Sequence, residues 1–108
     1  MTETLGDFEH LVLLALVRLG DDAYGMTVRQ EIEARTGRTI SLGAVYTTLD
    51  RLERKAFIRH RIGQPTAERG GRRKKLYRLE PLGARLLRET SRAYERMTAG
   101  LKKRLETL

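Results

Sequence analysis

The chain has 108 residues, a formal net charge of +8 and no cysteine, so it fits one domain and excludes disulfides and thiolate metal sites. Its most apolar run, Leu11 to Leu19, is too short to span a bilayer and has no basic region before it. We therefore expect a cytoplasmic protein, and its positive charge favours a polyanionic partner.

Apolar residues at helical spacing predict two helices in the first third of the chain. The first runs from about Asp7 to Leu19, with Asp7 as its N-cap, and its broad apolar face indicates a central place in the core. The second runs from about Ala23 to Arg35, and Gly37 suits the position just after its end. Its apolar face is narrow and consists of Tyr24, Val28 and Ile32.

A third helix is predicted from Ser41, its N-cap, to about Lys55. The apolar stripe of this helix consists of Leu42, Val45, Leu49 and Leu52. The residues facing away from the stripe are Gly43, Thr47, Asp50, Arg51 and Arg54, and Asp50 and Arg54 have the spacing of an ion pair. Tyr46 lies at the boundary, so a partly buried core tyrosine and a phosphate contact both stay open.

Positive charge is concentrated after this helix. Between Arg59 and Arg78 there are eight basic residues and one acidic residue, which is +7 of the total +8. Two short strands are predicted there, Phe57 to Ile62 and Lys74 to Leu79, joined by a glycine-containing basic tip from Gly63 to Arg73. A nearly neutral body with one basic hairpin indicates a binding element rather than a solvated charge run.

The last predicted helix begins at Pro81, a favourable first helical residue. Its apolar residues recur at heptad spacing, with further apolar residues at neighbouring positions: Leu87, Tyr94, Met97, Leu101, Leu105 and Leu108. This stripe favours dimerisation, and packing on the first helix of the same chain is the alternative.

The order of helix, helix, helix, hairpin and helix predicts a mainly α (α+β) fold, a winged helix-turn-helix with a C-terminal dimerisation helix. Residues 1–80 would form the DNA-binding domain and residues 81–108 the dimerisation helix. The third helix would enter the major groove, and the wing would contact the phosphate backbone or the minor groove. The candidate DNA-binding residues on the helix and the wing are Ser41, Gly43, Ala44, Thr47, Arg51, Arg69, Arg72, Arg73, Lys74 and Lys75.

Four stretches together resemble the PadR family of bacterial transcription regulators: LGDFEHLVLLAL, AYGMTVRQEIE, SLGAVYTTLDRLERKAFI and GGRRKKLYRLEPLG. The single C-terminal helix is similar to that of the smaller PadR subgroup. The resemblance implies a homodimeric winged-helix DNA-binding protein, usually a repressor, and it adds Tyr46 to the DNA-binding residues while supporting Arg72, Arg73 and Lys74. Glu80 departs from the family pattern, which often has Thr or Ser there, so we expect a less sharply defined start of the last helix.

Other functions have little support in the sequence. We expect no enzyme activity, cofactor or metal, because no nucleophile arrangement is present and the two histidines, His10 and His60, lie outside any ligand cluster. A winged-helix RNA-binding protein is the alternative from another class. A regulator whose dimer cleft also senses a small aromatic ligand is compatible with the main prediction, and the identity of any effector stays open.

Overall fold

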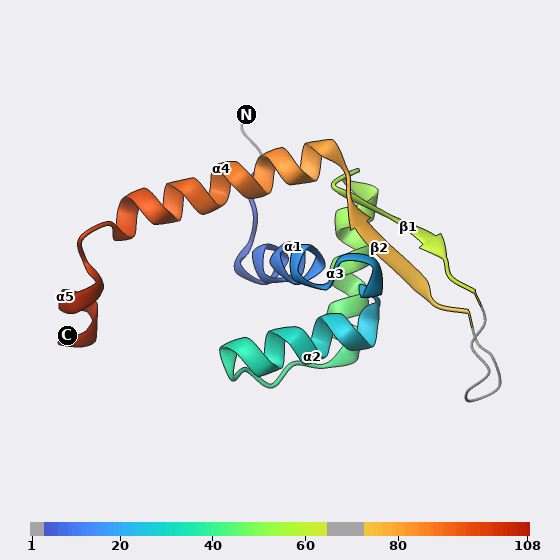
Figure 1. Ribbon diagram of the computed structural model, residues 1–108, viewed down its shortest axis with the longest axis horizontal. Coiled ribbons are helices and arrows are strands. Elements are labelled where there is room, and N and C mark those ends of the chain that lie inside the picture. Colours follow the sequence, from blue (N-terminus) through green and yellow to red (C-terminus); the bar gives the residue numbers. More distant parts are fainter. Residues whose placement is uncertain (1–3, 65–72) are drawn as a thin grey trace.

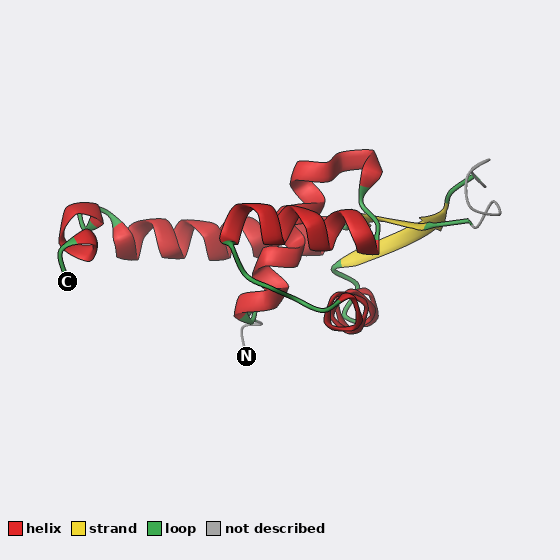
Figure 2. Cartoon of the chain, turned by 90° about the horizontal axis from the view of Figure 1, so that it is seen from below, coloured by secondary structure: helices red, strands yellow, loops and turns green. Residues whose placement is uncertain are grey.

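The computed structural model describes residues 4–64 and 73–108. Its elements are α1 (Asp7–Leu19), the short 3-10 helix η1 (Gly20–Asp22), α2 (Gly25–Thr36), α3 (Leu42–Arg54), β1 (Ile58–Ile62), β2 (Lys75–Leu79), α4 (Pro81–Thr98) and α5 (Lys102–Glu106). Figure 1 shows α1, α2 and α3 gathered in one body, and Figure 2 shows that the hairpin and α5 extend in opposite directions from it. The order of the elements confirms a mainly helical fold with a small two-stranded sheet.

The core lies where α1, α2 and α3 pack together. Leu13 of α1 and Leu49 and Leu52 of α3 have no exposed surface. The helix α2 contributes a narrower strip, Val28 and Ile32, as predicted. Tyr24 was predicted on the same face, but α2 begins at Gly25, so Tyr24 precedes the helix as its N-cap and is only half-buried. Full burial of one such side chain stabilises the fold by about 1.5–3 kcal/mol relative to exposure, so the three apolar stripes account for the packing of the helices.

Two helix ends are set by the residues predicted for them. The hydroxyl oxygen of Ser41 accepts a hydrogen bond from the Ala44 N–H at 3.0 Å, which confirms Ser41 as the N-cap of α3. Gly37 ends α2 with a left-handed φ of 73°. Glycine adopts this conformation without the steric cost that a Cβ atom imposes, so the turn into α3 starts where the sequence predicts it.

The predicted N-cap of α1 is wrong by one residue. Gly6 holds the cap position, and the Gly6 N–H donates to Oε1 of Glu9 at 2.9 Å. This is the return hydrogen bond of a capping box, which requires the acidic residue three positions after the cap. Asp7 instead accepts a hydrogen bond from Arg38 at 2.5 Å, and this contact lowers the pKa of the Asp7 carboxyl.

The hairpin is held against the helices at its base. β1 and β2 are antiparallel with His60 opposite Tyr77, and each strand begins one residue later than predicted. The Tyr77 N–H donates to the carbonyl oxygen of Ala23 at 2.8 Å, so β2 is joined to the segment before α2. A Cβ atom at Gly83 would lie 2.0 Å from the Phe57 carbonyl oxygen, so only glycine lets α4 approach the start of the hairpin this closely.

The C-terminal region is not the single helix that the heptad spacing predicts. α4 ends at Thr98, Gly100 has a φ of 77°, and α5 forms a separate short helix. The heptad stripe is therefore interrupted before Leu101, because the glycine introduces a left-handed residue that a continuous helix does not accept. The first half of α4 packs on the body, and its second half extends from it (Figure 1).

Candidate nucleic-acid interface

The outer face of α3 is open to solvent and consists mainly of small side chains. Val45, Leu49 and Leu52 occupy the opposite, buried face. The candidate residues of this segment are all exposed: Ser41, Gly43, Ala44, Tyr46, Thr47 and Arg51. The major groove of DNA is about 12 Å wide and admits a helix whose outer side chains do not hold it away from the bases, so this face has the shape that groove entry requires.

Tyr46 is held at the junction between α2 and α3. Its side chain is 45% exposed, but one part of the ring packs on Gly25. A Cβ atom at Gly25 would lie 2.5 Å from a ring carbon and 2.6 Å from the hydroxyl oxygen. Tyr46 is thus neither a core residue nor a free surface residue, and its hydroxyl lies at the first turn of α2, where the helix dipole favours an anion.

The base of the wing is fixed by an aromatic contact that the sequence did not predict. The ammonium nitrogen of Lys74 lies 4.2 Å from the ring centre of Tyr24, the N-cap of α2. Arg73 and Lys75 on either side are exposed. The two remaining candidate residues of the wing, Arg69 and Arg72, lie outside the described residues.

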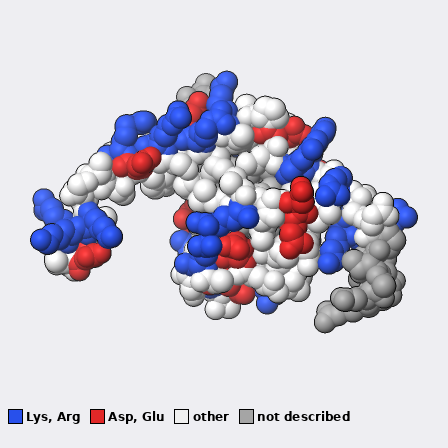
Figure 3. Space-filling view, in the orientation of Figure 1, with Lys and Arg blue, Asp and Glu red and all other residues white. Residues whose placement is uncertain are grey.

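The hairpin carries further arginines that were counted in the basic segment but not selected as site residues. Arg59 faces Arg78 across the two strands, and Arg61 lies two residues further along β1. Like charges in direct register are unfavourable, and Glu80 offsets one of them through a 2.8 Å contact with Arg59. The three arginines share the lining of a hollow of about 270 Å³, and Figure 3 shows basic side chains around the described part of the hairpin.

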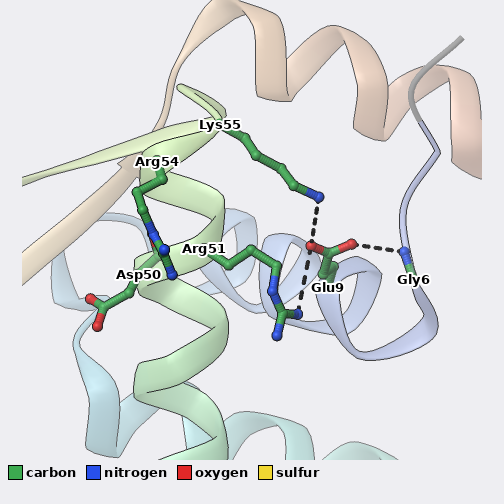
Figure 4. Close-up of polar contacts among 6 residues, drawn as sticks. All are labelled: Gly6, Glu9, Asp50, Arg51, Arg54 and Lys55. Atoms are coloured by element: carbon green, nitrogen blue, oxygen red, sulfur yellow. Dashed lines mark hydrogen bonds and ion pairs between the residues drawn. The ribbon is translucent and has the colours of Figure 1, made fainter. Parts of the chain in front are cut away.

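A buried carboxylate links α1 to the second half of α3. The Glu9 side chain is only 9% exposed, and its Oε2 lies 3.3 Å from Nζ of Lys55 and 3.9 Å from Nη1 of Arg51. Figure 4 shows Arg51 of α3 and Lys55, the C-cap of α3, reaching towards Glu9, which also accepts from the Gly6 N–H. No sequence pattern predicted this network, because Glu9 is far along the chain from Arg51 and Lys55.

The expected pairing of Asp50 with Arg54 takes a different form. Nε of Arg54 donates to the backbone carbonyl oxygen of Asp50 at 3.4 Å. In Figure 4 the carboxylate of Asp50 points away from that guanidinium. Both side chains are exposed, so both charges stay on the outer face of α3.

Both histidines have partners of their own. Nδ1 of His60 lies 2.6 Å from Oε2 of Glu53, and the ring of His10 stacks on Tyr94 with the centroids 5.5 Å apart. Within residues 4–64 and 73–108, no group of three or more His, Cys, Asp or Glu side chains could hold a metal ion. No helix in the same ranges is long and apolar enough to cross a membrane.

The residues predicted to form the dimer contact fall into two groups. Leu87 is only 6% exposed and belongs to the core of the single chain, as the intramolecular alternative requires. The others are exposed: Tyr94, Met97, Leu101, Leu105 and Leu108. Tyr94 stacks on His10 of α1, whereas the last four lie beyond the body. Nearer the hairpin, α1, α4 and the end of β2 form a largely apolar groove of about 410 Å³, lined by Leu14, Val17, Leu79, Ala84, Leu87, Arg88, Ser91 and Arg92.

Comparison with known proteins places this architecture in one family. The model of the transcriptional regulator PadR-like family matches residues 13–89, which include α2, α3 and the hairpin. A search of curated proteins found no match. Among solved structures, a PadR family regulator from Eggerthella lenta is 29% identical, with a TM-score of 0.64 over 91% of this chain and 83% of that one.

Two further structures share the fold at lower identity. A PadR family regulator from Clostridium difficile is 22% identical, with a TM-score of 0.74 over 93% of this chain and 99% of that one. The PcaV transcriptional regulator from Streptomyces coelicolor, solved with its natural ligand, is 21% identical, with a TM-score of 0.67 over 98% of this chain and 70% of that one. The exposed face of α3, the basic hairpin and the family match lead to one conclusion: the chain belongs to the PadR-like family of transcriptional regulators, has a winged-helix fold and is not an enzyme.

Proposed function

We propose that the protein is a homodimeric repressor that binds a pseudo-palindromic DNA operator in a sequence-specific manner. The observation that carries this proposal is the small, exposed outer face of α3 beside a strongly basic hairpin. A helix of this shape suits the major groove, and the guanidinium and ammonium groups of the wing suit the phosphates on its rim.

The two parts of the interface would have different tasks. Thr47 projects from the outer face of α3, and the exposed Arg51 would turn from Glu9 towards the same face. Both would contact base edges, which carry the sequence information. Arg73 and Lys75 lie at the base of the wing and would contact phosphates, which set the orientation of the protein on the duplex. Tyr46 would add a phosphate contact at the start of α2, where its hydroxyl is held by the packing on Gly25.

The apolar residues beyond the body support a dimer. Met97 is 76% exposed and Leu105 is 52% exposed in the single chain. Contiguous apolar surface of this kind usually marks a protein contact. The second half of α4 and α5 of one copy would pack against the same segments of the other, with the twofold axis of the dimer matching that of the operator.

A titration of binding against salt tests the DNA-binding proposal directly. Each phosphate contact contributes about −0.9 to the slope of log K against log salt. Fluorescence anisotropy with a labelled duplex between about 50 and 200 mM salt should therefore give a steep negative slope. A flat slope would contradict a phosphate contact by the wing.

Effector binding at the groove between α1 and α4 is a second candidate function. The groove is mostly apolar, and the side chains of Arg88 and Arg92 take part in its lining. Such a lining suits a small aromatic anion, whose ring would contact the leucines while its charge faces a guanidinium. A thermal-shift screen of aromatic carboxylates, with an Arg88→Ala and Arg92→Ala double variant as control, tests this function separately from DNA binding.

RNA binding has less support in the structure. Recognition of single-stranded RNA uses exposed aromatic rings on which bases stack. Phe57 and Tyr77 are buried, and the ring of Tyr24 lies under Lys74. The two exposed tyrosine rings have contacts of their own, Tyr46 with Gly25 and Tyr94 with His10. Tighter binding to single-stranded RNA than to duplex DNA in the same titration would favour this alternative.

A further inference from the structure

Glu9 is a nearly buried carboxylate whose role in the fold is more than that of a helix cap. Its Oε1 already accepts the Gly6 N–H, which completes the start of α1. Its Oε2 faces two cations, Arg51 of α3 and Lys55, the C-cap of that helix. A buried carboxylate needs such partners, because an ionised group without them is costly to remove from water.

The two cations are held to different degrees. Nζ of Lys55 donates to Oε2 of Glu9 at 3.3 Å, which is a hydrogen bond. Nη1 of Arg51 lies 3.9 Å from the same oxygen, which is an ion pair beyond hydrogen-bond distance, and the Arg51 side chain is 48% exposed. Arg51 can therefore leave Glu9 while Lys55 continues to neutralise the carboxylate.

We propose that Glu9 is a positioning residue for Arg51, acting as an internal counter-ion that competes with DNA for its guanidinium. In the free protein Glu9 holds Arg51 beside α1. On DNA the guanidinium exchanges this long ion pair for charge-assisted hydrogen bonds to a base edge or a phosphate, which are shorter and stronger. The inference rests on the proposed function, since it requires Arg51 to contact DNA.

The competition has a consequence that a purely structural role does not have. Removing the charge of Glu9 would release Arg51 and tighten DNA binding, even if the fold became less stable. An ion pair of this exposure contributes little, so we expect about a two- to fivefold gain in affinity.

A double-mutant cycle on the full chain tests the inference, with a duplex that the wild-type protein selects from a random-sequence pool as the probe. The variants are Glu9→Gln, Glu9→Asp and Arg51→Ala, and each Glu9 change is also combined with Arg51→Ala. Glutamine keeps the size of the side chain and an oxygen for the Gly6 N–H. Glu9→Asp is a charge-matched control, because the shorter side chain draws the carboxylate away from Arg51 without changing the net charge.

We expect Glu9→Gln to bind more tightly than the wild type, Glu9→Asp to show part of this gain, and both gains to disappear once Arg51 is alanine. The unfolding temperatures of all variants report any loss of the fold. If Glu9→Gln does not fold, the comparison of Glu9→Asp with the wild type tests the inference. Equal or weaker binding by Glu9→Gln, or no gain for Glu9→Asp, would overturn the inference.

The same cycle separates failure of the inference from failure of the proposed function. An equal gain with and without Arg51 would mean that Glu9 acts only through the net charge, and this would overturn the inference while leaving the DNA contact intact. If Arg51→Ala had no effect on binding in the wild-type background, the assignment of Arg51 as a DNA contact would fail, and the inference with it.

Discussion

The ammonium nitrogen of Lys74 lies 4.2 Å from the ring centre of Tyr24, so the base of the wing is joined to the N-cap of α2. A second link lies beside it, where the Tyr77 N–H donates to the Ala23 carbonyl oxygen. Together these contacts fix the direction of the hairpin relative to the helix-turn-helix. They join the wing, which would contact DNA phosphates, to the helix-turn-helix, which would contact base edges.

Replacing Tyr24 tests whether this link orients the wing. A cation–π contact at a partly exposed site contributes about 0.5–1 kcal/mol, so we expect Tyr24→Leu to weaken DNA binding by a similar amount. Tyr24→Phe keeps the ring and should bind like the wild type. Equal binding by the leucine and phenylalanine variants, measured by anisotropy, would show that the contact does not orient the wing.

The outer face of α3 should control base preference. We expect Thr47→Ala or Arg51→Ala to lose about 1–3 kcal/mol at one contacted base pair and to relax the preference there. The measurement is binding to a panel of duplexes that differ at single positions. A variant that weakened all duplexes equally would place its side chain on the backbone instead.

The wing should control affinity without changing base preference. Arg73→Ala combined with Lys75→Ala removes two exposed positive charges, so the salt slope should fall in magnitude by about 2 if each contacts a phosphate. Lys102→Ala combined with Lys103→Ala on α5 removes the same charge far from the hairpin and is the matched control. An equal loss in both pairs would indicate a general charge effect rather than a contact.

Tyr77 should make the stability of the fold depend on pH in the alkaline range. Burial raises the pKa of its phenol to about 12, with a further contribution from the negative charge of Glu53. The folded state therefore keeps a proton that the unfolded chain loses near its ordinary pKa of 10.0. This stabilisation is present below pH 10 and is lost as the pH rises from about 10 to 12.

Tyr77→Phe lacks the titrating group and provides the control for that prediction. Its unfolding temperature should fall less than that of the wild type between about pH 10 and 12. Parallel curves for the two proteins would show that the Tyr77 phenol does not carry the dependence.

The dimer should depend on the apolar residues beyond the body. Met97→Asp would bury a carboxylate in the contact, at a cost of about 2 kcal/mol or more, and should shift the protein towards a monomer in sedimentation experiments. Arg96→Ala changes the net charge by the same single unit at a neighbouring position and should remain a dimer. A wild type that sediments as a monomer would contradict the proposed dimer and favour α4 packing within its own chain.

Local signals predicted most of the fold. Ser41 and Gly37 mark helix ends through their own chemistry, and the apolar stripes of α1 and α3 are complete within each helix. The break at Gly100 was missed because the heptad spacing continues through it. The contacts of Glu9 with α3 and of Lys74 with Tyr24 depend on how distant elements pack, and no local pattern encodes them.

The burial of Leu87 also could not be predicted from the sequence. Heptad spacing describes which residues share a face but not what covers that face. Leu87 is covered by the chain's own body, whereas Met97 on the same helix is exposed. Only the packing of α4 on α1 shows that Leu87 is a core residue and that Met97 is a candidate contact residue.

Selection of duplexes from a random-sequence pool by the wild-type protein tests the central claim most directly. A twofold dimer that reads DNA with α3 predicts enrichment of a pseudo-palindrome whose half-sites are about 34 Å apart, one turn of the duplex. Arg51→Ala should weaken or change the preference at symmetric positions of that sequence. A pool that stays random after repeated rounds, while the protein retains salt-dependent binding, would contradict sequence-specific recognition by α3.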